Sequence, residues 1–479
     1  MSILETNRYL QGNYGPVEQE VTAYDLPIQG ELPAELRGRY VRNGPNSVTE
    51  PDPESYHWFM GDGMVHGLRI NEGRAEWYRN RWVGSRKLAQ LRGQDDVPGA
   101  QWNGGPVGAN TNVAGFAGTT WATVEAGGCP VELNYELETV GRNDFYGTLP
   151  GAFTAHPKLD PDSGEMHAMV HNWPRWGERI QYVVVGADGR VSRAANIPLA
   201  GMTMLHDMSL TSRFAVIYDQ PVTLDFNLAG EGMFPFRWNP DHGNRVGLVP
   251  RNAPFERLVD EIVWVDVPLG FAFHPLNAYD TPDGKVVIDI CNYQRMFDED
   301  RFGPFESLPG LERWELDPKR RTTSTTVIDE TPNEFPRHRG SLTSKQHRYG
   351  YCVAPSNDPS EGWPTIKHDL ATGARQVFDH GPGRCAGEAV FVPRETNNAE
   401  DDGWLLCFVH DLARASAEFV VMDAQDFGRG YVAQVQLPQR IPFGFHGNWI
   451  SDNAVAPPPP RPEEDTSAGA ADETDGSAD

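Results

Sequence analysis

The chain has 479 residues, and its 67 acidic side chains against 41 basic ones give a formal net charge of −26 at pH 7. This excess of negative charge disfavours binding to nucleic-acid phosphates or anionic lipid surfaces, so no nucleic-acid partner is expected. The 49 glycines and 39 prolines are spread along the whole length and interrupt it too often for long helices, which favours a mostly β protein.

The cysteine pattern and the first residues of the chain indicate the cellular compartment in which the protein is expected. The five cysteines are odd in number and widely spaced, without a Cys-x-x-Cys pair, which fits neither a disulfide framework nor a zinc cluster. The first residues lack a basic segment followed by an apolar run, and no stretch approaches the roughly eighteen apolar residues of a membrane span. We therefore expect a cytoplasmic protein that is neither exported by a signal nor membrane-spanning.

Two early segments, 39–46 (RYVRNGPN) and 56–70 (YHWFMGDGMVHGLRI), crowd aromatic and small residues around turn glycines. This composition predicts tight packing near the centre of the fold. His66 lies in the second segment, between Val65 and Gly67, and has no companion in a similar setting, so we interpret it as a structural histidine.

From there the sequence repeats short β-rich runs joined by turns of Asp, Gly or Asn. Examples are the segments 181–193, 261–268, 283–293, 368–380, 403–411 and 418–426. Hairpins that continue along most of the chain without helical periodicity favour a β-propeller over a sandwich, and seven blades would have roughly sixty to seventy residues each. We expect one propeller domain over 1–454 and a disordered acidic, Pro/Ala-rich tail over 455–479.

Four histidines share one kind of setting, a short and partly apolar segment that ends in small or turn-forming residues: His156, His206, His274 and His446. A lone histidine in such a run is usually satisfied by a backbone carbonyl. Four of them, separated by about one, one, and two to three blades, predict rings that converge on the propeller axis around a shared ligand. Imidazole suits zinc, copper, iron and nickel, so the residues alone leave the metal open.

Three glutamates lie beside apolar residues where an unpaired carboxylate would be costly: Glu125, Glu334 and Glu388. Carboxylates in such places could accept hydrogen bonds from the outer nitrogens of metal-bound histidines, which orients each ring and makes it a better donor. Each could instead belong to a structural ion pair.

Ten short motifs, in order, resemble the carotenoid cleavage oxygenase family along nearly the whole predicted domain. They are RNGPN, GDGMVHG, ANTNV, AHPKLDP, LHDMSLT, FHPLNAYD, EFPR, GEAVFVPR, EDDGWLLC and FHGNW. The segments YHWFMGDGMVHG, WYRNRWV and QRMFDEDRFGP are similar to bacterial, actinomycete-type members. The resemblance implies an all-β, seven-bladed propeller with the metal on its axis, under a cap of loops and short helices.

The resemblance also implies the site. One non-haem Fe(II) per chain would be bound by His156, His206, His274 and His446, with Glu125, Glu334 and Glu388 behind the last three histidines, respectively. Thr111 in ANTNV matches a threonine whose methyl group crowds one open position of the iron in relatives. The implied reaction is dioxygenase cleavage of a conjugated carbon–carbon double bond of a carotenoid or apocarotenoid, with O2 as co-substrate and two carbonyl products.

The implied partner is an apolar polyene bound by a monomer. Relatives take their substrates from membranes through an apolar patch, and here the segment 230–240, with Met233, Phe234, Phe236 and Trp238, is the candidate for such peripheral contact. The alternative interpretation is that these side chains belong to the propeller core.

Three other functions compete with polyene cleavage. A stilbene-cleaving dioxygenase would use the same iron, but such relatives have a lysine before the first glutamate and a nearby tyrosine, where this chain has Val124 and, by our alignment, Trp82. A non-oxidative isomerohydrolase is the second alternative. A metal-free propeller scaffold is the third, and it would tolerate the loss of any one of the four histidines.

Overall fold

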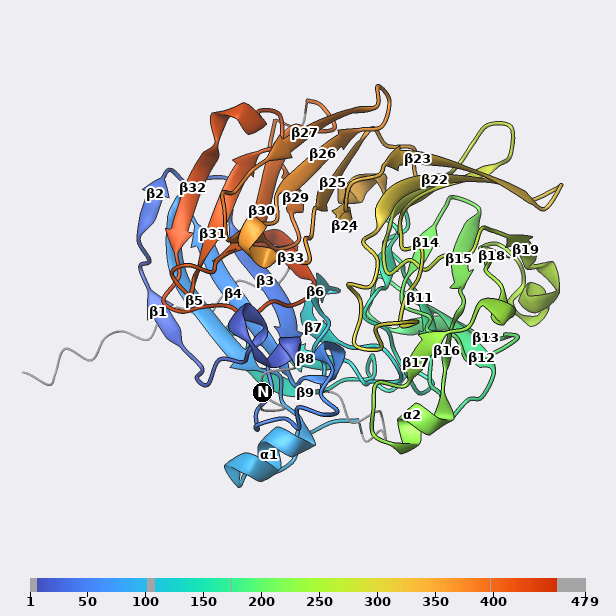
Figure 1. Ribbon diagram of the computed structural model, residues 1–479, viewed down its shortest axis with the longest axis horizontal. Helices are drawn as coiled ribbons and strands as arrows, with labels where there is room; N and C mark the ends of the chain where they lie inside the picture. The colour runs from blue at the N-terminus through green and yellow to red at the C-terminus, as the bar shows by residue number, and fades with distance from the viewer. Residues whose placement is uncertain (1–6, 101–107, 174, 397, 455–479) are drawn as a thin grey trace, which may run out of the picture.

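The computed structural model describes residues 7–100, 108–173, 175–396 and 398–454. It confirms the predicted propeller: seven antiparallel sheets form the blades, and one further two-stranded sheet lies outside them. Figure 1 shows the blades following one another around the centre, so that blue N-terminal strands meet red and orange C-terminal ones. The predicted tail, 455–479, lies outside the described residues.

Six of the blades have these strands. The second has β6 (Asn112–Phe116), β7 (Thr119–Thr123), β8 (Val131–Leu133) and β9 (Thr139–Arg142); the third has β10 (Lys158–Leu159), β11 (Met166–His171), β12 (Arg179–Val185) and β13 (Val191–Pro198). The fourth has β14 (Met208–Leu210), β15 (Phe214–Asp219), β18 (Arg245–Pro250) and β19 (Val263–Asp266); the fifth has β20 (Pro275–Asp280), β21 (Val286–Asn292), β22 (Gly310–Asp317) and β23 (Thr322–Asp329). The sixth has β24 (Glu334–Arg337), β25 (Tyr349–Val353), β26 (Thr365–Asp369) and β27 (Ala374–Phe378); the seventh has β28 (Arg384–Ala386), β29 (Val390–Pro393), β30 (Gly403–Asp411), β31 (Ser416–Asp423), β32 (Tyr431–Gln436) and β2 (Ile28–Gly30).

The first blade joins both ends of the described chain. Its strands are, in order, β1 (Thr22–Tyr24), β5 (Arg74–Trp82), β4 (Gly63–Asn71), β3 (Gly38–Pro45) and the late strand β33 (Gly447–Ser451). The pairing of β33 with β3, and of β2 with β32 in the seventh blade, closes the ring twice. These pairings join the two ends of the described chain to the blades, so that blades surround the central axis on all sides.

A hairpin and short helices complete the chain. β16 (Val222–Leu224) and β17 (Phe236–Trp238) interrupt the fourth blade and carry α2 (Phe226–Gly230) between them, and α1 (Arg86–Arg92) follows β5. The 3₁₀ helices are Arg8–Leu10, Gly12–Tyr14, Trp58–Met60, Pro240–His242, Phe255–Glu261, Gly340–Leu342, Pro359–Glu361, Phe427–Arg429 and Asp452–Ala454. Within the described ranges, no helix is long and apolar enough to cross a membrane.

Burial explains why these segments become strands. β11, β15 and β30 are buried along their whole length, because blades pack face to face and cover both sides of each middle strand. The outer strand β13 alternates exposed and partly buried positions, and β23 is mostly exposed. The predicted β-rich runs are confirmed as strands, and His66 is buried with its Nδ1 2.9 Å from the Tyr78 hydroxyl, as expected for a structural histidine.

Candidate metal centre

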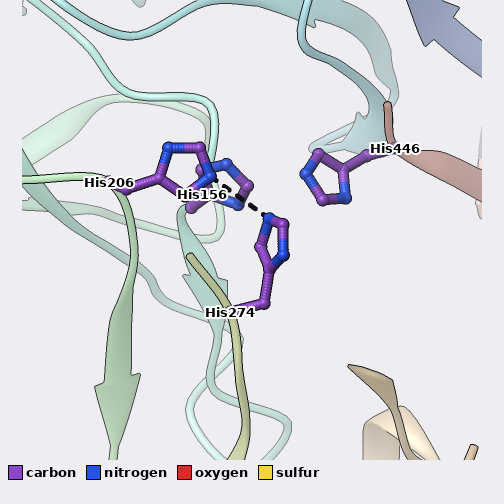
Figure 2. Close-up of side chains that lie close together, drawn as sticks. All are labelled: His156, His206, His274 and His446. Carbon is purple, nitrogen blue, oxygen red and sulfur yellow. Dashed lines mark hydrogen bonds between the residues drawn. The ribbon is translucent and has the colours of Figure 1, made fainter. Parts of the chain in front are cut away.

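The four predicted histidines converge at the centre of the propeller (Figure 2). Each one comes just before the edge strand of a different blade: His156 before β10, His206 before β14, His274 before β20 and His446 before β33. One ring nitrogen from each lies within 4.8 Å of the others, and all four residues are buried. Loop residues at the inner ends of the blades thus place the rings on the axis.

The four rings pack against one another, and two of them are within hydrogen-bond distance. Their centroids are 4.3 Å apart for His156 and His206 and 5.3 Å apart for His156 and His274. The Nε2 atoms of His206 and His274 are 3.2 Å apart. Burial, reinforced by the neighbouring rings, holds the pKa of His156 well below its usual value. A neutral ring of this kind has a free lone pair to offer.

Glu334 holds His274. Its Oε2 accepts from His274 Nδ1 at 2.6 Å and from the backbone N–H of Phe335, while the Tyr293 hydroxyl donates to Oε1 at 3.0 Å. Burial lowers the pKa of His274, but the Glu334 carboxylate outweighs burial and raises it. Because Glu334 Oε2 accepts from Nδ1, the neutral His274 ring carries its proton on Nδ1, and its Nε2 has the lone pair. An irregular register at the start of β24, where Phe335 has φ 49°, turns Glu334 toward the ring.

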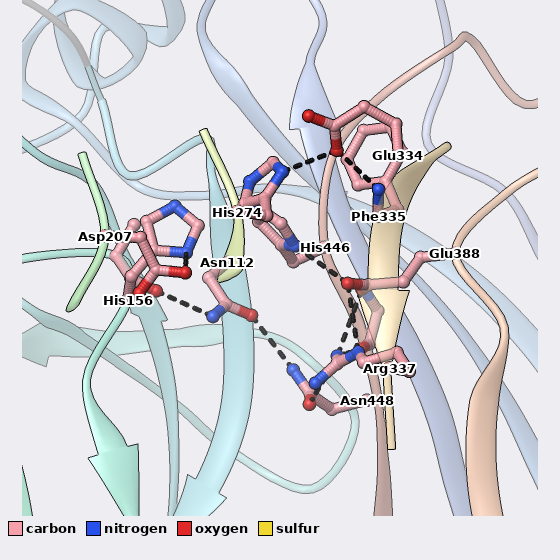
Figure 3. Close-up of polar contacts among 12 residues, drawn as sticks. Asn112, His156, Asp207, His274, Glu334, Phe335, Arg337, Glu388, His446 and Asn448 are labelled. Atoms are coloured by element: carbon pink, nitrogen blue, oxygen red, sulfur yellow. Dashed lines mark hydrogen bonds and ion pairs between the residues drawn. The ribbon is translucent and has the colours of Figure 1, made fainter. Parts of the chain in front are cut away.

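Glu388 holds His446 in the same way, from the break between β28 and β29 (Figure 3). Its Oε1 lies 3.1 Å from His446 Nδ1, and its Oε2 accepts from the backbone N–H of Gly447 at 2.8 Å and from Arg337 Nη2 at 3.0 Å. Burial raises the pKa of Glu388, but Arg337 and His446 bring it down to about 2. The group is a carboxylate at neutral pH, as its role as acceptor requires.

Glu125, just after β7, is shared between two histidines rather than paired with one. Its Oε1 lies 2.9 Å from His206 Nδ1, the predicted partner, and 3.0 Å from His156 Nε2. These three atoms are buried and form no hydrogen bond among the described residues, although the carboxylate oxygen lies close to both rings. The contact with His206 was expected from the sequence, whereas the contact with His156 was not.

The residue set fits a transition-metal ion. Four neutral imidazoles are good ligands for a divalent first-row metal, and carboxylates behind the rings offset its charge. His156 Nε2 and His206 Nδ1 are buried and contact only the shared Glu125 Oε1, with which neither forms a hydrogen bond. An unsatisfied buried polar atom costs about 1–3 kcal/mol, which a protein rarely tolerates without a functional reason.

Asp207, Asn112 and Asn448 are neighbours of the cluster that sequence reasoning missed. Asp207 Oδ2 lies 3.8 Å from His156 Nδ1, and the same carboxylate pairs with Lys158 Nζ. Asn112 Nδ2 donates to Ala155 O at 2.7 Å and Asn112 Oδ1 accepts from Asn448 Nδ2 at 2.9 Å, which fixes the segment before His156 (Figure 3). In the sequence, Asp207 directly follows His206 and Lys158 lies two residues after His156, and this proximity to the histidines could have indicated the contact.

Thr111 contacts the cluster through His446. Its carbonyl oxygen accepts from the backbone N–H of His446 at 3.2 Å, and its hydroxyl donates to Asn110 Oδ1 at 2.9 Å. Asn110 is itself anchored, since its Nδ2 donates to the carbonyls of Phe59 and Gly61. The side chain of Thr111 is therefore fixed in orientation where it lines the central cavity.

A cavity of about 290 Å³ opens onto His206, His274 and His446. Its walls are largely aromatic and include Trp58, Phe59, Trp173, Phe234, Phe273 and Phe335. An apolar cavity that ends on a polar cluster suits a long apolar ligand brought to a metal.

The candidate membrane segment, 230–240, contributes to this cavity rather than to an exposed patch. Phe234 and Phe236 line it, and Phe234 stacks on His57 with ring centroids 4.1 Å apart. Met233 and Trp238 are partly buried. The alternative interpretation, that these side chains belong to the propeller core, is the one that the contacts support.

Trp82, the residue aligned with the tyrosine of stilbene-cleaving relatives, is not part of the cavity wall formed by the described residues. Its indole N–H donates to Asn46 O at 2.9 Å.

A model of the family described as retinal pigment epithelial membrane protein matches residues 14–451. A carotenoid cleavage oxygenase of Mycobacterium tuberculosis is 40% identical over an alignment that covers 92% of this chain and 97% of the relative. The chain belongs to the carotenoid oxygenase family.

Other members of the carotenoid oxygenase family extend the likeness. A carotenoid 9,10(9',10')-cleavage dioxygenase of Phaseolus vulgaris is 31% identical, covering 94% of this chain and 90% of the relative. Among solved structures, the lignostilbene dioxygenase of Pseudomonas brassicacearum has a TM-score of 0.83 at 28% identity, covering 93% of this chain and 99% of that one. A variant of the apocarotenoid oxygenase of Synechocystis has a TM-score of 0.79 at 26% identity, covering 92% and 98%.

One further histidine at the carotenoid oxygenase cavity was not predicted. His171 ends β11, is 5% exposed and lines the cavity. Burial lowers its pKa to about 4, so the ring is neutral at pH 7. A histidine at the end of the apolar run MHAMVHNW was the available signal, but sequence alone does not say that the strand ends at the cavity.

Proposed function

We propose that this chain is an iron(II)-dependent dioxygenase that cleaves a conjugated double bond of a carotenoid or apocarotenoid with O2 to give two carbonyl products. The observation that carries the proposal is the buried four-histidine cluster at the end of an aromatic cavity. Its curated relatives are named as carotenoid cleavage enzymes.

In this proposal, His156, His206, His274 and His446 bind the iron, one ion per chain. Bound iron(II) would make possible the reaction of O2 with the double bond, which is otherwise spin-forbidden. Glu334 and Glu388 keep a proton on Nδ1 of His274 and His446, so that Nε2 faces the metal. Glu125 is the carboxylate beside Nδ1 of His206 and would orient that ring. Thr111, oriented by Asn110, limits the space beside the metal.

The cavity walls position the substrate. Aromatic side chains exclude water and hold an apolar polyene with one double bond at the cluster, so that much of the rate advantage comes from orientation. None of these residues needs to act as an acid or a base. A monomeric state, peripheral membrane contact for substrate uptake and a cytoplasmic location remain predictions.

Glu334→Gln tests the role of the carboxylate behind His274. An amide offers a weaker acceptor to Nδ1, so we expect a ten- to hundredfold loss of iron affinity or turnover, of about the size usual for such partners. Iron content after dialysis and the rate of polyene cleavage are the measurements. Glu312→Gln is the control, because Glu312 accepts from Trp314 and Asn292 in the fifth blade, outside the cluster. Equal iron retention and rate in Glu334→Gln and wild type would contradict the assignment.

Stilbene cleavage is the second candidate, favoured by the likeness to the lignostilbene dioxygenase. The cavity beside Glu125 has the apolar Val124 on its wall. A buried phenol facing valine would lose a hydrogen bond at a cost of about 1–3 kcal/mol, whereas a polyene would lose nothing.

Side-by-side incubation of the iron-loaded protein with an apocarotenal and with resveratrol separates the two candidates. We expect aldehyde products from the apocarotenal and little or no cleavage of resveratrol, measured by chromatography. Efficient cleavage of resveratrol alone would reverse the assignment of substrate, and cleavage of neither by a fully iron-loaded protein would count against the dioxygenase itself.

A further inference from the structure

The four histidines have two kinds of neighbours at the centre of the propeller. Aromatic side chains form the cavity onto which three of the rings open. The second kind is polar and lies outside the wall that the described residues give this cavity. Its members, which we call the axial polar group, are Asn112, Lys158, Asp207, Arg337 and Asn448. Figure 3 shows Asn112, Arg337 and Asn448 in contact with one another next to His446.

Strand geometry explains how polar side chains come to lie beside the cluster. Successive side chains of an extended chain point alternately to its two faces, so residues two positions apart share a face. Lys158 follows His156 by two residues and begins β10, and Asn448 follows His446 by two residues in β33. Both side chains therefore continue from the histidines along the inner edges of their blades.

Hydrogen bonds connect the axial polar group around the axis. Asn448 Oδ1 accepts from Arg337 Nη2 at 3.0 Å, and Asn448 Nδ2 donates to Asn112 Oδ1 at 2.9 Å, which links the first, second and sixth blades. Lys158 Nζ pairs with Asp207 at 2.8 Å, just before the fourth blade. Lys158 also lies within electrostatic reach of His338, which follows β24 in the sixth blade, so its ammonium group faces the axis.

The axial polar group extends from solvent to the cluster. The Lys158 side chain is 25% exposed, and Asn112 and Asn448 are partly exposed although they lie at the inner edges of the blades. Asp207 is buried, and its Oδ2 lies 3.8 Å from His156 Nδ1. Polar atoms thus lead from side chains that water reaches to a ring of the cluster.

A metal ion has to cross one of these two surroundings to reach four buried histidines. A divalent ion that passes through an aromatic cavity loses its hydration and gains nothing in return, which is very costly. Amide, carboxylate and water oxygens along the axis can replace the lost hydration step by step. The polar side therefore offers the lower barrier.

We propose that iron(II) enters and leaves the cluster through the axial polar group, and that the Lys158–Asp207 ion pair controls the rate. This inference rests on the proposed iron site and goes beyond it. The Lys158 ammonium group repels an incoming cation, whereas the Asp207 carboxylate attracts it once the pair opens. Metal uptake and polyene binding then use different sides of the histidine cluster.

The rate of iron(II) uptake by metal-stripped protein, without O2, tests the route. Iron(II) still free at timed intervals is trapped by a chromogenic chelator, so the readout does not depend on turnover. We expect Lys158→Glu to take up iron(II) about fivefold faster than wild type at low salt, since a unit charge near a divalent ion has an effect of this size in a high dielectric. Added salt should reduce the difference, which a purely structural effect would not show.

Three further variants complete the series. Lys158→Met only removes the charge and should give a smaller rise, and it replaces Lys158→Glu if that protein is unfolded by its melting curve. Lys158→Arg keeps the charge and should load like wild type. Lys319→Glu is the matched control, because it makes the same change of net charge at an exposed position in the turn between β22 and β23. Its uptake rate should equal that of wild type.

Wild-type protein with a polyene bound gives a second measurement that needs no variant. Because the polyene fills the aromatic cavity, the proposed route predicts the same uptake rate with and without it. Uptake that the polyene blocks, or equal rates in Lys158→Glu and Lys319→Glu, would overturn the route and leave the iron site and the dioxygenase proposal standing. A wild-type protein that takes up no iron under any condition would overturn the function on which the inference rests.

Discussion

Alanine in place of His274 is expected to abolish both iron binding and polyene cleavage while leaving the propeller folded. Of the four histidines, His274 has its Nδ1–H placed most firmly, because Glu334 accepts it at 2.6 Å. Its removal takes one of four donors from the metal and leaves a buried carboxylate without its ring partner. Iron per chain by elemental analysis, turnover, and the melting temperature with and without added iron are the measurements.

His368→Ala is the control for this experiment. His368 is also buried, in β26 of the sixth blade, and its Nε2 bonds to Asn333 Oδ1 at 2.7 Å, outside the cluster. We expect it to lower the melting temperature while keeping one iron per chain and the turnover of wild type. A His274→Ala protein that kept full iron and full turnover would remove this residue from the metal site, and a scaffold without metal would predict that result.

Arg337→Met is expected to have the largest effect on stability. Arg337 contacts Glu388 through Nη2 at 3.0 Å and through Nε at 2.9 Å, and it also donates to Asn448 Oδ1. The Glu388 side chain is only 3% exposed, so methionine would leave a buried carboxylate without its cation. Breaking such a pair from one side costs about 3–5 kcal/mol. Because Glu388 also orients His446, iron affinity should fall together with the melting temperature.

Denaturant unfolding of the metal-free and iron-loaded forms measures both effects. Arg375→Met, in β27 of the same blade, is the matched control: its partner Asp329 is also acidic, but the Arg375 side chain is 44% exposed. Because its cation is this exposed, the pair is more strongly screened by solvent than the Arg337–Glu388 pair, and its loss should cost less. Equal losses of stability in Arg337→Met and Arg375→Met would show that the buried pair is not what holds Glu388 in place.

Local sequence predicted the strands and the four histidines that meet at the centre, because both predictions depend on features close together in the chain. The runs around β12, β21 and β30 have the apolar and β-branched composition of buried strands. The four histidines share one setting, and the resemblance to a known family placed Glu334 and Glu388 beside His274 and His446, where the structure has them.

The remaining features depend on contacts between distant segments. The pairing of β33 with β3 joins residues about four hundred positions apart, and no local pattern encodes it. The position of Glu125 between two rings, the inward packing of Phe234, and the hydrogen bond that turns Trp82 away from the cavity all follow from side-chain direction. Sequence position restricts that direction only weakly.

The closing strand β33 also determines when during synthesis the site can exist. His446 directly precedes β33, whose partner β3 is among the first segments to leave the ribosome. At typical translation rates of about 5–20 residues per second, the early blades wait many seconds before their last ligand emerges. A nascent chain that ends before residue 446 carries at most three of the four histidines. If the four histidines bind iron as proposed, the complete site can form only after His446 has emerged and β33 has paired with β3.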